Sequence, residues 1–258
     1  MSEEWNFYFC QVDDKPASIF VDLGIREQVP VAALPHRACL SLILKHPRED
    51  GLSSQQEYEV LSAFEDALKQ HLDTPDSMYV GRNTSDGRRD FWCFVADPVA
   101  WEQRVAALMA GFAGYERETY TAEDPDWDAY LNFLYPNEEG FDFMSNGQVC
   151  DRMEASGDPL TQARDIDHWA YFPDDTSRQA FLDQVEPLGF AVRELYERES
   201  DEGAEPDDEP FVARVFRCDT PSHRDIHDVT VPLLRAARAA GGRYDGWETQ
   251  RLAPDATH

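Results

Sequence analysis

Arg164-Asp-Ile-Asp-His-Trp-Ala-Tyr-Phe172 is the stretch on which the fold assignment depends. Its apolar and polar side chains alternate, which predicts a β-strand with one buried face. His168 shares the face of Ile166 and Ala170, because side chains two apart on a strand point the same way. We therefore expect a histidine of the core or of the strand end, and not a partner of the aspartates on the opposite face.

The elements after this strand follow a recognisable order. Helical spacing or strand alternation predicts a helix, two strands, a second helix that ends at Gly241-Gly242, and a final strand. The expected ranges are 175–186, 190–197, 211–218, 222–240 and 244–252. The order β-α-β-β-α-β is that of the split βαβ, or ferredoxin-like, unit.

The N-terminal part of the chain predicts the same order of strands and helices. Residues 38–121 predict a first β-α-β-β-α-β unit, and two strands at 5–12 and 17–23 predict a hairpin before it. A short helical stretch stops at Pro136, and residues 138–155 predict a further helix. The expected fold class is α+β, with two ferredoxin-like (βαββαβ) domains in tandem and the hairpin leading the first. The expected domains are residues 1–137 and 138–258.

The charge balance narrows the choice of partner. The chain has 23 basic and 51 acidic residues, a formal net charge of -28. Direct nucleic-acid binding is disfavoured, because phosphates are bound by Lys and Arg. A basic protein, such as an Arg-rich segment, fits the sign of the charge; the alternative is that the charge serves solubility alone.

The sequence lacks export signals, membrane spans and catalytic motifs. The acidic start and the lack of an 18-residue apolar run predict a cytoplasmic protein that makes no membrane contact. Five scattered cysteines predict reduced thiols and no disulfide framework. No phosphate loop or nucleophile motif occurs. His223 and His227 have helical metal-ligand spacing but no third ligand in the sequence pattern, so we expect no enzyme, metal or cofactor.

Aromatic and acidic residues of the first and last strands of the C-terminal unit are the first interface candidates. In a sheet of order 4-1-3-2 these strands pair, which brings the end of one near the start of the other. RNA-binding sheets surround such aromatics with basic residues, whereas the flanking residues here are acidic. The cluster predicts either packing against the helix at 138–155 or a protein-binding patch. Its members are Asp165, Asp167, Trp169, Tyr171, Tyr244, Asp245 and Trp247.

The second candidate is an acidic run between the second and third strands of that unit. Residues 199–209 carry no apolar side chain larger than alanine, so they predict a loop that is either a solvated connection or an attraction point for a basic partner. Its acidic residues are Glu199, Asp201, Glu202, Glu205, Asp207, Asp208 and Glu209.

Two family resemblances follow from these stretches. The strand quoted above, Leu188-Gly-Phe190, and Gly241-Gly-Arg-Tyr-Asp-Gly-Trp-Glu-Thr249 resemble the family of regulator of ribonuclease E activity B (RraB) over about residues 138–252. The resemblance implies an acidic cytosolic bacterial protein that binds ribonuclease E, chiefly its non-catalytic region, and reduces RNA cleavage. Together with the acidic charge of the chain, this favours an Arg-rich segment of the endoribonuclease as the partner. An immunity or antitoxin protein that neutralises a basic partner is the alternative.

The N-terminal half resembles the domain of unknown function DUF695. The matching stretches are Trp5-Asn-Phe-Tyr, Ala17-Ser-Ile, Gly81-Arg-Asn-Thr-Ser-Asp-Gly-Arg-Arg-Asp-Phe91 and Trp127-Asp-Ala-Tyr-Leu-Asn-Phe-Leu-Tyr-Pro136. This resemblance implies no activity.

Overall fold

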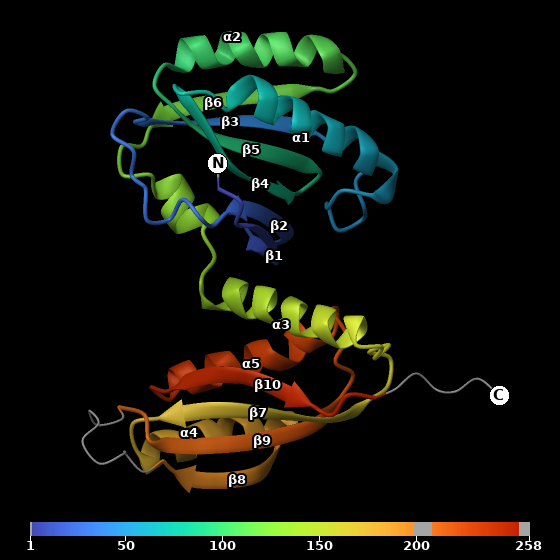
Figure 1. Cartoon of the computed structure of the whole chain (residues 1–258), viewed down its shortest axis with the longest axis vertical. Coiled ribbons are helices and arrows are strands. Elements are labelled where there is room, and N and C mark those ends of the chain that lie inside the picture. The colour runs from blue at the N-terminus through green and yellow to red at the C-terminus, as the bar shows by residue number, and fades with distance from the viewer. Residues whose placement is uncertain (1, 199–207, 253–258) are drawn as a thin grey trace, which may run out of the picture. The chain divides into compact units, whose positions relative to one another are not determined.

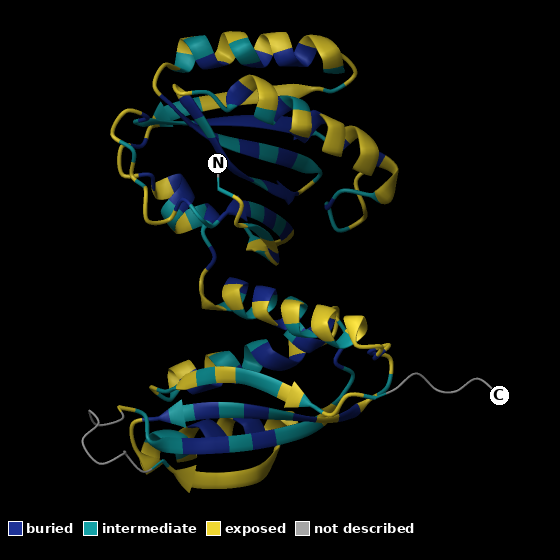
Figure 2. Ribbon diagram, in the orientation of Figure 1, coloured by how far each residue is buried: buried dark blue, intermediate teal, exposed yellow. Residues whose placement is uncertain are grey.

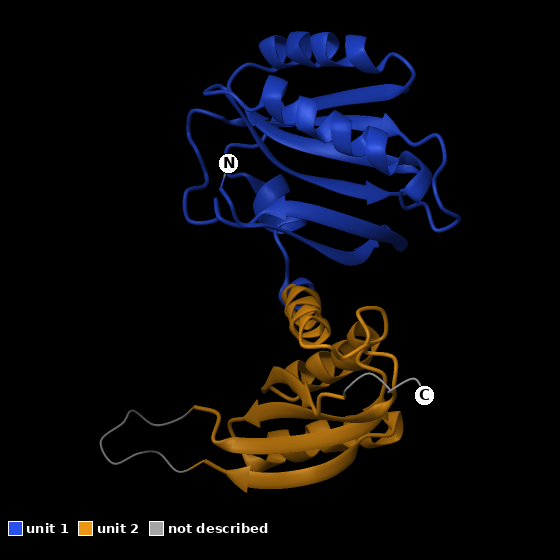
Figure 3. Ribbon diagram, turned by 45° about the vertical axis from the view of Figure 1, so that its right-hand side comes forward, with its two compact units in different colours: residues 1–140 blue, residues 141–258 orange. Residues whose placement is uncertain are grey.

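The chain forms two compact units, residues 1–140 and 141–258, each with its own hydrophobic core (Figures 1 and 3). The computed structural model describes residues 2–198 and 208–252. Antiparallel sheets and helices build both units, so the class is α+β. None of the helices in the described ranges has both the length and the apolar character to span a bilayer.

The N-terminal unit is a six-stranded sheet with two helices on one face. Its strand order is β1-β2-β4-β5-β3-β6, and every neighbouring pair is antiparallel. The elements are β1 (Trp5–Val12), β2 (Lys15–Asp22), β3 (His36–Ile43), α1 (Tyr58–Leu72), β4 (Ser77–Ser85), β5 (Arg88–Val95), α2 (Pro98–Met109) and β6 (Arg117–Glu123). Apolar side chains of β3, β5, α1 and α2 form the core.

A one-turn π-helix covers part of the opposite face of this sheet. It spans Ala129–Leu134 and follows Trp127, whose ring stacks on Phe94 with centroids 3.8 Å apart. Tyr130 donates a hydrogen bond to the backbone oxygen of Asp22, 2.7 Å away. Packing and hydrogen bonding thus tie the segment after β6 back onto the sheet.

The C-terminal unit is a four-stranded antiparallel sheet in the order β10-β7-β9-β8. Its elements are α3 (Glu138–Ala155), β7 (Arg164–Phe172), α4 (Asp175–Val185), β8 (Ala191–Glu197), β9 (Phe211–Asp219), α5 (Ile226–Ala239) and β10 (Arg243–Thr249). Buried side chains of α4 and α5 meet alternate residues of β7 and β9 in one core. Figure 2 shows this alternation, and shows β8 exposed along its length.

Local chemistry explains the ends of both core helices. Asp174 caps α4 by accepting a hydrogen bond of 2.7 Å from the amide of Ser177. After α5, Gly241 takes a left-handed conformation with φ of 76°, which glycine adopts without strain. A β-carbon on Gly242 would lie 2.2 Å from the Phe172 ring, so this position also needs glycine. The predicted helix end at Gly241-Gly242 is confirmed.

Candidate protein-binding face of the C-terminal sheet

One face of the C-terminal sheet points away from the helical core. On β7 the core side carries Ile166, Ala170 and Phe172, which are fully buried or nearly so. Asp165, Asp167, Trp169 and Tyr171 alternate with them and are only half-buried or exposed. We call the side of the sheet that carries these four residues the open face.

An arginine of β9 links the aromatic and acidic side chains at the centre of the open face. Arg214 lies directly opposite Trp169 in the strand pairing, and its guanidinium sits 4.8 Å from the centroid of that ring. The same group donates a hydrogen bond of 3.1 Å to Asp167 and lies 3.6 Å from Glu248 of β10. The indole is therefore stacked under a cation that two carboxylates hold.

A second arginine repeats the arrangement toward β8. Arg193 occupies a bulge in β8, and its guanidinium lies 3.7 Å from the ring centroid of Phe216. It donates to Asp167 at 2.8 Å and to Asp165 at 2.9 Å. These hydrogen bonds to Asp165 and Asp167 raise the pKa of the Arg193 guanidinium.

Two guanidinium groups lie over the Tyr171 ring at the other end of the face. Arg198 lies 4.5 Å and Arg243 lies 4.8 Å from its ring centroid. Arg243 in turn pairs with Asp245 and, at 3.1 Å, with Glu209. Each arginine of the open face thus contacts both an aromatic ring and a carboxylate or backbone oxygen.

The predicted acidic surroundings of Trp169 and Tyr171 were therefore wrong in part. The acids are present, but arginines from neighbouring strands lie between them and the rings. They could have been found only from the strand register, since they are distant along the chain from β7. The open-face residues that the sequence pattern missed are Arg193, Arg198, Arg214, Phe216, Arg243 and Glu248.

Two predicted members of the cluster lie on the other side of the sheet. Tyr244 pairs with Ala170, and its hydroxyl is 2.8 Å from Nδ1 of the buried His168. Trp247 pairs with His168 and donates a hydrogen bond of 2.7 Å to Asn146 of α3. The reason is a bulge between Tyr244 and Gly246, which shifts the alternation so that both aromatics face the helices.

The sequence left two interpretations of this aromatic and acidic cluster, packing against the helix at 138–155 or a protein-binding patch. Different members of the cluster follow different interpretations. Trp247 packs toward α3, as one interpretation had it. Trp169 and Tyr171 lie on the open face with Asp165 and Asp167. His168 was expected in the core or at the strand end, and the structure places it in the core, since 1% of its surface is exposed.

The acidic run falls largely outside the described residues. Glu199, Asp201, Glu202, Glu205 and Asp207 belong to the range 199–207, which the structure does not describe. Asp208 is exposed, and Glu209 pairs with Arg243 at the border of the open face.

These features define an α+β protein of two antiparallel-sheet units, the second with an aromatic and charged open face. The family model described as "Family of unknown function (DUF695)" matches residues 3–135, and "Regulator of ribonuclease activity B" (RraB) matches residues 144–249. The chain belongs to the DUF695 family and carries an RraB domain after the DUF695 domain.

No curated protein matches the chain. A crystal structure of an unknown protein from Galdieria sulphuraria matches with 12% identity, covering 83% of this chain and 97% of that one. Its TM-score of 0.23 is too low to support any inference.

Proposed function

We propose that the chain is a non-enzymatic cytoplasmic regulator that binds a ribonuclease E-type endoribonuclease and inhibits it by protein contact. The observation that carries the proposal is the RraB match, which spans every strand of the C-terminal sheet. The N-terminal match is to a family of unknown function and adds no activity.

The open face is our proposed docking surface. Trp, Tyr and Arg side chains often contribute most of the binding energy at protein interfaces. The open face carries all three. Asp165 and Glu248 remain well exposed at its border, so an incoming Arg-rich segment would find carboxylates there. RNA fits less well, because the arginines already pair with carboxylates and the chain as a whole would repel phosphates.

We also propose that both units have ferredoxin-like topology. In the N-terminal sheet β5 lies between β3 and β4, and β6 pairs with β3. In the C-terminal sheet β9 lies between β7 and β8 in the same way, and β10 pairs with β7. In the N-terminal unit the hairpin β1-β2 extends this sheet beyond β4. The RraB domain would then present the sheet face that its helices leave uncovered.

A charge-reversal variant tests the docking surface. We expect the double variant Asp165→Lys, Glu248→Lys to weaken binding to the Arg-rich non-catalytic region of ribonuclease E at least about tenfold, because like charges would meet across the interface. Calorimetry with the full chain at low and high salt measures the affinity. Inhibition of RNA cleavage should fall in parallel, and salt should weaken the wild-type complex.

The control has the same change in net charge on the helical side. Asp183→Lys, Glu186→Lys alters two exposed residues at the end of α4. We expect this variant to bind nearly as well as the wild type. Equal losses in both variants would show that overall charge, not the open face, controls binding, and no wild-type binding at low salt would refute the proposed function.

A further inference from the structure

A cluster of three polar side chains joins α3 to the connection between β9 and α5. Asp151 and Glu154 lie three residues apart on the last turns of α3, so they share one side of the helix. His223 comes from the β9–α5 connection and points its Nε2 atom at both carboxylates. One ligand-type atom from each residue lies within 4.8 Å of the other two.

The distances suit a shared cation better than direct hydrogen bonds. Nε2 of His223 is 3.4 Å from Asp151 and 3.5 Å from Glu154, beyond the usual 2.7–3.2 Å of an N–H···O bond. Around a tetrahedral ion with bonds of about 2.1 Å, neighbouring ligand atoms are about 3.4 Å apart. The imidazole nitrogen and each carboxylate therefore already have the separation of two ligands on one ion.

The backbone around the cluster is well fixed. Cys150, next to Asp151, is buried and its thiol contacts the backbone oxygen of Pro221 at 3.4 Å. Ser222 closes a turn with Asp225, whose amide donates to the Ser222 hydroxyl at 3.1 Å. His223 thus follows directly after two anchored residues.

We propose that Asp151, Glu154 and His223 form a site for a divalent transition-metal ion of the zinc type, completed by water. One imidazole and two carboxylates are a donor set that such ions accept, and the C-terminal end of a helix favours a positive charge. A bound ion would tie the end of α3 to the β9–α5 connection. No metal site was expected from the sequence. His227, whose spacing from His223 would suit a metal pair, does not join this cluster, because it lies beside Asp142 and Phe143.

Zinc titration of the full chain tests this site. After removal of metals with a chelator, calorimetry at slightly alkaline pH should give one zinc ion per chain. We expect His223→Ala and the near-isosteric Asp151→Asn each to weaken binding at least about tenfold. His227→Ala is the matched histidine control and should bind like the wild type. A Cys218→Ser background removes the exposed thiol as an alternative ligand.

Cobalt supplies a second readout. Cobalt bound by nitrogen and oxygen ligands should show weak visible bands and no thiolate charge-transfer band, and zinc should displace it. No binding by the wild type, unchanged binding by His223→Ala, or a thiolate band in the Cys218→Ser protein would overturn the proposal. The test involves no ribonuclease, so its result is independent of the proposed function.

Discussion

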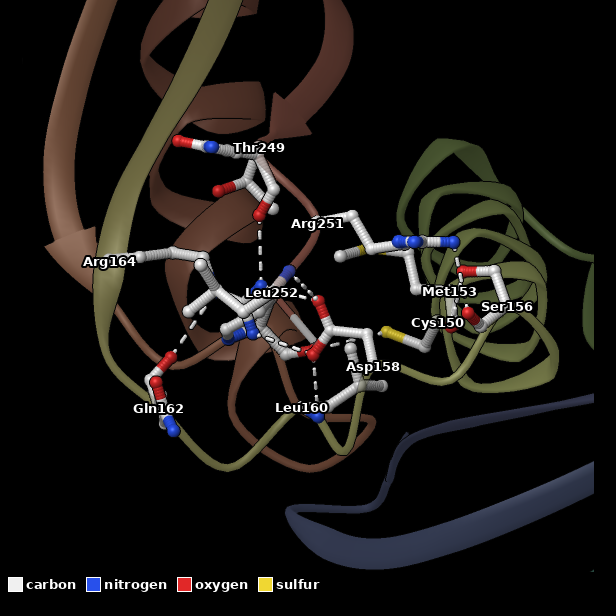
Figure 4. A network of polar contacts seen from close by, with 12 residues as sticks. Cys150, Met153, Ser156, Asp158, Leu160, Gln162, Arg164, Thr249, Arg251 and Leu252 are labelled. Atoms are coloured by element: carbon white, nitrogen blue, oxygen red, sulfur yellow. Dashed lines mark hydrogen bonds and ion pairs between the residues drawn. The ribbon is translucent and has the colours of Figure 1, made fainter. Parts of the chain in front are cut away.

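Replacing Asp158 by alanine is expected to lower the free energy of unfolding of the C-terminal unit by about 3–5 kcal/mol. The Asp158 side chain has 0% exposure and pairs with the nearly buried Arg164 at 2.5 Å. Its two oxygens also accept backbone hydrogen bonds from Leu160 and Leu252, at 2.9 and 2.7 Å (Figure 4). The variant leaves a buried guanidinium without its counter-charge, which is why the effect is large.

The position of this pair adds to the expected loss. Arg164 begins β7 and also donates to the backbone oxygen of Gln250, just after β10. The pair therefore joins the α3–β7 connection, the central strand and the segment after the last strand. The hydrogen bonds that Arg164 donates to the Asp158 carboxylate hold the pKa of Asp158 well below its usual range. A carboxyl of this kind stabilises the fold above its unfolded pKa, near 4, and that contribution is lost as the pH falls further.

An ion pair of the same length whose carboxylate is exposed provides the comparison. Asp175 and Arg178 are also 2.5 Å apart, but the Asp175 side chain is 72% exposed. Asp175→Ala should cost no more than about 1 kcal/mol. Urea unfolding of the full chain, with amide hydrogen exchange of β7 and β9 peptides as the reporter for this unit, measures both. Equal destabilisation by the two variants would contradict the assigned role of burial.

Local pattern was enough to predict the elements around this network. The helix Glu138–Ala155 and the strand Arg164–Phe172 begin and end where their spacing predicts. Amphipathic periodicity carries this information because each element must bury one side. The glycines after α5 were equally informative, since their backbone conformation and close packing exclude other residues.

The candidate site depended on information that local pattern does not hold. Trp247 lies on the helical side because of one bulge residue in β10, and a bulge reverses the alternation after it. Arg214 meets Trp169 because of the β7–β9 register, which residues 45 positions apart in the sequence cannot reveal by spacing. The cluster of His223 with Asp151 is likewise a product of tertiary packing.

The other large expected effect is acid sensitivity that originates at His168. Burial lowers the pKa of His168 from 6.5 to about 3. Its Nδ1 lies 2.8 Å from the Tyr244 hydroxyl, and its ring packs edge-on against Phe190. Asp219 favours the charged form and Arg217 opposes it, but these two pair with each other on β9. The imidazole is therefore neutral in the folded state.

The sign of the pH dependence follows from this depressed pKa. Between about pH 6.5 and pH 3 the unfolded chain binds a proton that the folded chain does not. The contribution of neutral His168 is complete above pH 6.5 and decreases as the pH falls through this window. At about pH 5 the C-terminal unit should have lost about 2 kcal/mol from this residue, since each pH unit corresponds to about 1.4 kcal/mol.

A variant that cannot titrate isolates the effect. His168→Gln should be less stable than the wild type at neutral pH, because a packed ring is lost, but its stability should change about 2 kcal/mol less between neutral pH and about pH 5. His227→Gln serves as the control for the loss of an imidazole from the same unit, since its ring lies beside Asp142 and outside this buried pair. Urea unfolding at both pH values, read by hydrogen exchange in β7, measures the difference. If His168→Gln kept the full pH dependence, the acid sensitivity would have to originate in other groups, and the buried neutral imidazole would not be its source.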